Sequence, residues 1–414
     1  MIRISQRSKL ALSVIAASIA LPSVAQAAFV EDSKASLELR NMYLNRDARD
    51  GTISGQSYGE TWAQGFIAKF ESGYTGGPIG FGVDAIGMLG IKLDSSKGNT
   101  IGNMLPVGAD GVPDDEYSEL GLTAKARVSK TELKVGTLQP LLPVAQYNNT
   151  RLLPGTYTGG MLTSQEIAGL TLNAGRLTEF NARDSSNNEE FASNIDNFDF
   201  AGGSYAFNQQ LTASYYYGDY DNAYQQHFGG LVYKLPLGEG LSLTSDLRYF
   251  NTQDQDDEAL GLIDNDMYQG MFTLAVGAHK FGAGYQSLSG DGNFPFIAGG
   301  DPFSINLVTY QTFTTQETDA WQVRYDYDFA SLGVPGLTFM TRYVNGDNID
   351  TAASDDGKAW ERDSDLVYTL QSGSLKGLRF HLRNVTYRAS DVSGTVGRDV
   401  DENRVIISYT LPLL

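Results

Sequence analysis

The chain has 414 residues, no cysteine, and 49 acidic against 30 basic residues, so its formal net charge is −19. The absence of cysteine excludes disulfide scaffolds, thiolate zinc sites and cysteine nucleophiles. Hydrophobic residues make up 41% of the chain, too many for an acidic disordered protein, and the negative charge opposes nucleic-acid binding. The three histidines, His227, His279 and His381, are scattered and unpaired, so we expect no metal site and no cofactor.

The first 27 residues have the pattern of an export signal. Three basic residues precede an apolar stretch at 10–21, and Ala25-Gln26-Ala27 is an A-x-A cleavage site. The apolar stretch is too short to cross a membrane as a helix, although an N-terminal membrane anchor is the alternative interpretation. We therefore expect a cleaved signal peptide at 1–27 and a single domain at 28–414, exported to the outer membrane.

From the cleavage site onward, the chain alternates between apolar and polar residues. In Leu241–Tyr249 and Trp321–Phe329, aliphatic and aromatic residues occupy one face, and polar or charged residues occupy the other. A period of two over about nine residues predicts a β-strand. Short turns, such as 129–130, 279–280 and 333–336, join pairs of strands. Longer polar stretches, such as Asp94–Tyr117 and Asp347–Asp363, separate the pairs.

Short turns at one rim and long loops at the other are typical of a transmembrane antiparallel β-barrel, an all-β fold. A soluble β-sandwich is the alternative, but the export signal and the aromatic residues at the strand ends favour a barrel. At ~21 residues per strand, the 387 residues after the signal (414 − 27) predict about eighteen strands. A barrel of this size encloses an aqueous lumen.

If apolar residues face lipid, the alternation predicts which charged residues face the lumen. Basic side chains dominate this set, and rings of such side chains select anions. The alternative is structural: the arginines pair with acids such as Asp246, Asp326 and Asp328, whereas Arg379 and Arg383 have no such acid on their own strand. The predicted channel-lining basic residues are Arg40, Lys125, Arg127, Arg248, Arg324, Arg342, Arg379, His381, Arg383 and Arg404.

The segment 139–160 is the predicted constriction. Three prolines stiffen it, and it holds too many apolar residues for a loop in water, so we expect it to fold into the barrel. An ordinary surface loop is the alternative. The polar residues expected at the constriction are Gln146, Tyr147, Asn148 and Arg151. A second apolar loop, 293–308, would add Asp301, which could otherwise only cap a turn.

Several segments, in order and with matching spacing, resemble the OprD family of outer-membrane carboxylate channels. The most specific are 324–329 followed by 333–343, and the others include 39–47, 150–154, 295–301, 361–366 and 402–404. The resemblance covers the whole chain after the signal. It implies an 18-stranded barrel whose inward third loop forms a narrow eyelet, and a row of arginines that guides small carboxylates such as aromatic acids or amino acids by passive diffusion.

Carried over by position, the arginine row of the family falls on Arg40, Arg379, Arg383 and Arg404. The sequence departs from the family pattern at two places. His381 takes the place of an arginine, which would make the row sensitive to pH. The last residue is Leu414, where outer-membrane barrels usually end in Phe or Trp.

Two other functions are weaker interpretations. A channel for neutral oligosaccharides such as chito-oligosaccharides would need a row of lumen aromatics, and Tyr216, Phe250 and Tyr387 do not form a continuous one. A barrel enzyme is the more remote alternative, because no G-x-S-x-G motif occurs. The expected partners are a small carboxylate, outer-membrane lipid with lipopolysaccharide, and the barrel-assembly machinery. A homotrimer and a monomer both remain open.

Overall fold

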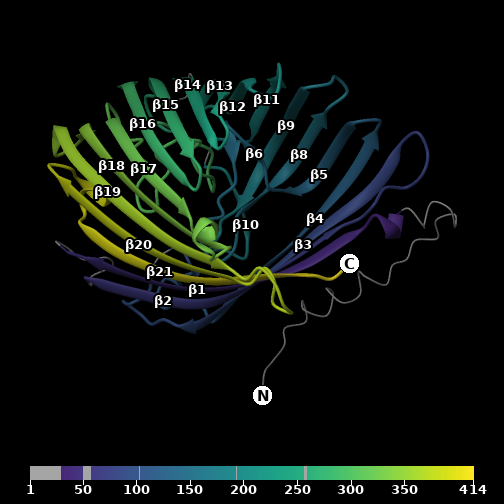
Figure 1. The fold of residues 1–414 in the computed structure, drawn as a ribbon, viewed down its shortest axis with the longest axis horizontal. Coiled ribbons are helices and arrows are strands. Elements are labelled where there is room, and N and C mark those ends of the chain that lie inside the picture. Colours follow the sequence, from purple (N-terminus) through teal and green to yellow (C-terminus); the bar gives the residue numbers. More distant parts are fainter. Residues whose placement is uncertain (1–28, 50–56, 102, 193, 256–258) are drawn as a thin grey trace.

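The computed structural model describes residues 29–49, 57–101, 103–192, 194–255 and 259–414. The expected signal peptide at 1–27 lies outside these residues. The main sheet has 19 strands, of which β10 (Asn188–Glu190) pairs only with β9, so the barrel in the described part of the chain has 19 − 1 = 18. β1 pairs with both β2 and β21, so the antiparallel sheet closes on itself (Figure 1).

The barrel strands follow one another in chain order. Their bounds are β1 (Lys34–Ala48), β2 (Tyr58–Glu71), β3 (Gly80–Asp94), β4 (Glu116–Val128), β5 (Thr131–Leu138), β8 (Thr156–Ser164), β9 (Leu170–Asn181), β11 (Phe198–Ala206), β12 (Leu211–Tyr220), β13 (Tyr224–Gly238), β14 (Leu241–Asp254), β15 (Asp264–Val276), β16 (His279–Asp291), β17 (Asp319–Asp328), β18 (Leu337–Thr351), β19 (Ser354–Thr369), β20 (Arg379–Ser390) and β21 (Val400–Pro412). Two further elements, β6 (Leu141–Leu142) and β7 (Ala145–Gln146), form a small hairpin inside the third loop.

The alternation in the sequence separates the two faces of the wall. On β17, Trp321 and Val323 are exposed at 43% and 49%, whereas Gln322 between them is buried. Exposed aliphatic and aromatic side chains facing outward are the lipid-contacting surface of a barrel. Among the described residues, no helix is both long and apolar enough to cross a membrane.

The loops divide between the two rims nearly as expected. One rim carries short turns, such as 129–130 and 239–240, and the other carries the third loop (139–155) and the seventh loop (292–318). Two of the turns and loops predicted from the sequence were wrong. The turn expected at 279–280 lies at 277–278, and 347–363 is not a long loop, because β18 and β19 extend as a paired hairpin that turns at 352–353.

Loops fill a large part of the barrel interior. An apolar cluster joins inward residues of β8 to β16 to the loops, with Val144 and Phe294 as loop members and Phe250 as a wall member. A second cluster packs Leu152 and Leu153 of the third loop against the inner faces of β1 and β2. A third cluster packs Val308 and Phe313 of the seventh loop against inward residues of β17–β21, such as Val344 and Tyr387.

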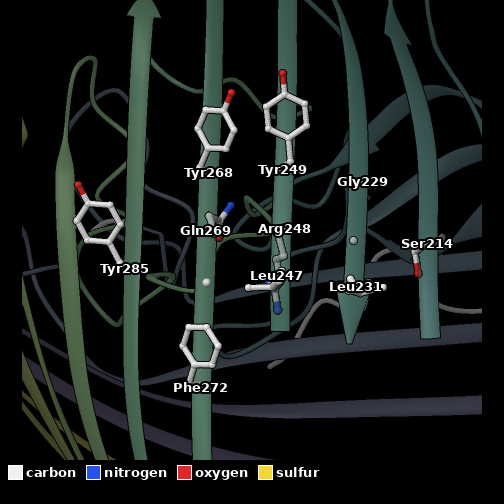
Figure 2. Close-up of a pocket in the computed structure, with 12 residues that line it drawn as sticks. Ser214, Gly229, Leu231, Leu247, Arg248, Tyr249, Tyr268, Gln269, Phe272 and Tyr285 are labelled. Atoms are coloured by element: carbon white, nitrogen blue, oxygen red, sulfur yellow. The ribbon is translucent and has the colours of Figure 1, made fainter. Parts of the chain in front are cut away.

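The outer wall has a shallow hollow of about 710 Å³ over β13–β16. Figure 2 shows Tyr249 and Tyr268 side by side on β14 and β15, with Phe272 farther along β15. The hollow exists because Gly229 and Gly270 contribute no side chain to its floor. It faces outward and is therefore separate from the lumen.

Candidate functional site: the inner wall and its two loops

A group of basic side chains lies on the inner face of β17, β18, β20, β21 and β1. Arg324 and Arg342 are register partners on β17 and β18, and Arg383 is the register partner of Arg404 on β20 and β21. Arg40 follows on β1. Each shares the side of its strand with buried residues, as the alternation predicts. The basic residues of five strands are thus brought to one inner wall.

Most of these arginines are held by an acid. Arg324 donates to both carboxylate oxygens of Asp326 at 2.8 and 2.7 Å, and Arg248 does the same with Asp246 at 3.1 and 2.7 Å. Arg342 donates to Asp363 from two nitrogens, at 3.0 and 2.7 Å. Arg404 binds Glu402 at 2.5 Å. The structural pairing left open by the sequence therefore exists at all four positions.

The sequence offered Arg383 no acid on its own strand, and β20 indeed contains none. The acid lies on the adjacent strand, where Asp365 is the register partner of Arg383. Both carboxylate oxygens of Asp365 accept from Arg383, at 2.6 and 2.7 Å, and His381 Nε2 lies 3.1 Å from the same carboxylate. Arg379 is exposed, and no acid lies within ion-pair distance of it in the described part of the chain.

Lys125 and Arg127 lie away from this wall, on β4. The Lys125 ammonium is buried between Asp84, at 2.6 Å, and the Ser72 carbonyl, at 2.7 Å. Arg127 is exposed and stacks over the Tyr74 ring at 4.0 Å. Both are near the short-turn rim, so they form a separate group, and Lys125 is committed to a buried ion pair.

The third loop folds into the barrel, as expected. Arg40 Nη1 donates to Asn149 Oδ1 and the Arg151 carbonyl at 2.9 Å each, and to the Leu152 carbonyl at 3.3 Å. Arg404 Nη1 reaches the Thr150 carbonyl at 3.4 Å. Arg151 itself is only 8% exposed. Arg40 and Arg404 therefore hold the loop against the wall.

The third loop also joins the seventh loop. Tyr147 and Gly300 form an isolated β-bridge, and Asp301 donates its backbone N–H to the Gln146 carbonyl at 3.0 Å. Asn148 Nδ2 donates to Asp301 Oδ1 at 2.7 Å. Burial raises the pKa of Asp301 to about 6. Asp301 thus ties the two loops together.

The middle of the seventh loop, residues 303–311, forms a strap along the inner wall. Side chains from successive strands bind its backbone and side chains. The contacts from the first strands are Arg248 Nη1 to the Phe303 carbonyl at 3.3 Å, Ile305 N to Gln269 Oε1 at 2.7 Å, Ser304 Oγ to Gln286 Oε1 at 2.7 Å, and Gln322 Nε2 to the Ile305 carbonyl at 3.1 Å.

The far end of the strap is held most tightly. Glu361 Oε1 accepts the backbone N–H groups of Thr309 and Tyr310 at 3.0 and 2.8 Å, and its Oε2 accepts that of Gln311 at 2.9 Å. Arg342 Nη1 and Arg404 Nη2 donate to strap carbonyls at 3.3 Å each. Arg248, Arg342 and Arg404 therefore hold the strap, which covers them.

The sequence interpretation missed two basic residues of this site. Arg46 pairs with Glu402 at 2.5 Å. It lies six positions after Arg40 on β1 and therefore on the same face of the strand, so the alternation could have identified it. Arg183 donates to Asn148 Oδ1 at 2.9 Å and Thr150 Oγ1 at 2.6 Å. It lies just beyond β9, in a loop, where no periodic signal marks its direction.

The geometry gives little support to the two weaker functions. Tyr216, Phe250 and Tyr387 are at most 4% exposed, because the loops cover them, so they offer no surface to a sugar. His227 and His279 bond tyrosine hydroxyls on the outer wall at 2.8 Å. Within the described residues, none of the histidines is hydrogen-bonded to a serine hydroxyl.

Comparison with known proteins identifies relatives over the full length. The model of a family described as outer membrane porin, OprD family, matches residues 27–413. The chain is 39% identical to a porin-like protein GalP of Pseudomonas putida over 97% of both chains. Two crystal structures from Pseudomonas aeruginosa cover 93% of this chain and 100% of their own. OccK9 (OpdG) has a TM-score of 0.89 at 43% identity, and OpdK, solved with vanillate, has 0.87 at 38%.

Proposed function

Because this chain belongs to the OprD family of outer membrane porins, we propose that it passes small carboxylates by passive diffusion along its inner arginines. The proposed substrates are aromatic acids or amino acids. The proposed route lies beside the basic wall, past the constriction at Gln146, Tyr147, Asn148, Arg151 and Asp301 of the joined loops.

The observation that carries the proposal is the exposure of three arginine side chains on the inner wall. Arg379 is exposed, and the side chains of Arg324 and Arg383 are 38% and 22% exposed. A guanidinium in a narrow lumen attracts a carboxylate and orients it by paired hydrogen bonds. The relative OpdK was crystallised with vanillate, a small aromatic carboxylate, which supports this class of solute.

Ion selectivity in planar bilayers tests the proposal. Under a salt gradient, the reversal potential of the wild-type channel is expected to show preference for anions, and Arg383→Ala is expected to reduce that preference. Arg176→Ala removes a cation from the outer wall, where Arg176 pairs with Asp199, and serves as the matched control. A cation-selective wild-type channel, with no block by benzoate, vanillate or an amino acid, would refute the proposal.

A further inference from the structure

We infer that Asp365 sets how long a carboxylate stays in the channel, by occupying the binding edge of Arg383. This inference rests on the proposed function. In this inference, Arg383 binds the carboxylate of the solute, and Asp365 beside it weakens that binding.

The contact between the two residues uses one complete edge of the guanidinium. Arg383 Nε donates to Asp365 Oδ1 at 2.6 Å, and Nη2 donates to Oδ2 at 2.7 Å. This is the paired geometry in which an arginine binds a carboxylate most strongly. Among the contacts of the described residues, Arg383 Nη1 has no hydrogen-bond partner. The side chain remains 22% exposed.

A solute carboxylate therefore meets Arg383 with its best edge already filled. It can reach Nη1, but it cannot form two parallel bonds to Nε and Nη2 unless it displaces Asp365. The charge of Asp365 also opposes its approach. Both effects weaken binding at a site that still attracts anions, and a channel conducts only if a bound solute can leave.

A second pair on the same wall has this arrangement. Arg324 gives its Nε and Nη2 to Asp326 at 2.8 and 2.7 Å and leaves its side chain 38% exposed. The arginines that hold the strap differ, because their remaining nitrogen is bound to a loop carbonyl. The inference therefore concerns the open pairs, and Asp365 is the sharper case because it also contacts His381.

The test compares Asp365→Asn with the wild type in planar bilayers, with benzoate as the blocking solute. The substitution keeps the shape of the side chain and removes its charge. Blocking events are expected to last about ten-fold longer, the effect of roughly one additional hydrogen bond to a charged group. Benzoate flux into liposomes is expected to fall, because release becomes slower.

The matched control is Asp199→Asn. Asp199 binds Arg176 through the same two-bond geometry, at 2.6 and 2.5 Å, but on the outer wall of β9 and β11. It is expected to leave the duration of block unchanged. A second variant, Asp365→Ala, checks that the effect does not depend on the asparagine amide. Heat-dependent mobility on gels verifies that each barrel is folded.

The outcomes separate the inference from the proposed function. If Arg383→Ala shortens block but folded Asp365→Asn and Asp365→Ala leave it unchanged or shorter, Asp365 has no such role and the carboxylate channel stands. If benzoate, vanillate and amino acids all fail to block the wild type, the proposed carboxylate channel is refuted, and the role of Asp365 is refuted with it. A loss of binding, rather than a gain, is what a purely structural role of Asp365 predicts.

Discussion

Replacing Glu361 should release the strap from the inner wall. Its buried carboxylate accepts three consecutive backbone N–H groups, those of residues 309–311, and Glu361 has no exposed surface. Glu361→Gln keeps one carbonyl oxygen, which can still accept from Thr309 and Tyr310. Its amide group then faces the N–H of Gln311, so two donors meet and that bond is lost.

The size of the effect follows from the number of acceptors removed. One hydrogen bond to a charged group contributes about 1.5–3 kcal/mol, so Glu361→Gln should weaken docking of the strap by roughly that amount. Glu361→Ala leaves all three N–H groups without this acceptor and should cost up to about three times as much. Even the smaller loss shifts the ratio of docked to undocked strap at least about ten-fold.

Single-channel recording measures the release directly. The open channel of Glu361→Ala is expected to have a higher mean conductance and larger current fluctuations, with Glu361→Gln intermediate. Glu60→Gln is the control, because Glu60 binds Tyr43 and Tyr58 on the outer wall. Wild-type conductance and fluctuations in a folded Glu361→Ala channel would refute the idea that the strap is held by this residue and narrows the lumen.

Three further predictions concern the joined loops. Arg40→Ala removes the donor to three acceptors in the third loop, which should weaken docking of this loop by about 1–3 kcal/mol. Trypsin should then cleave faster after Arg151, which is only 8% exposed in the docked loop. An unchanged cleavage rate would argue that Arg40 does not hold the loop. Burial raises the pKa of Asp301 to about 6, so its charge is present above that pH and lost below it. Anion preference should therefore increase between pH 7 and pH 5 in the wild type but change less in Asp301→Asn, and equal profiles would contradict this role. At Gly300, a Cβ would lie 2.7 Å from the Gln146 carbonyl, so Gly300→Ala should part the loops and raise conductance, whereas Gly76→Ala, in open space, should not.

The barrel could be predicted because each strand is recognisable from the residues of its own segment. Alternation along segments such as 321–329 reports the two environments of the wall directly, and chain length limits the number of strands. The exception at 347–363 is instructive. Its polar residues suggested a loop, but β18 and β19 continue there as a paired hairpin. Backbone pairing does not require apolar side chains, which a barrel strand needs only where it contacts lipid.

The site was less predictable because its contacts are distant in the chain. The alternation gave the direction of Arg383, but its partner Asp365 lies 18 positions earlier on another strand, and only the strand register joins them. The contact between Glu361 and the strap also joins residues that are distant in the chain. Its own strand offers no sign that the backbone of residues 309–311 approaches it.

The pairing of β1 with β21 has a consequence for biogenesis. The last strand to leave the ribosome completes the hydrogen-bond circuit with the first, over 13 register pairs from Ser36–Pro412 to Ala48–Val400. Until then, both strands present bare backbone donors and acceptors that hydrocarbon cannot satisfy. Insertion must therefore be nearly all-or-none: a chain truncated before β21 should be degraded or aggregate instead of forming a smaller pore.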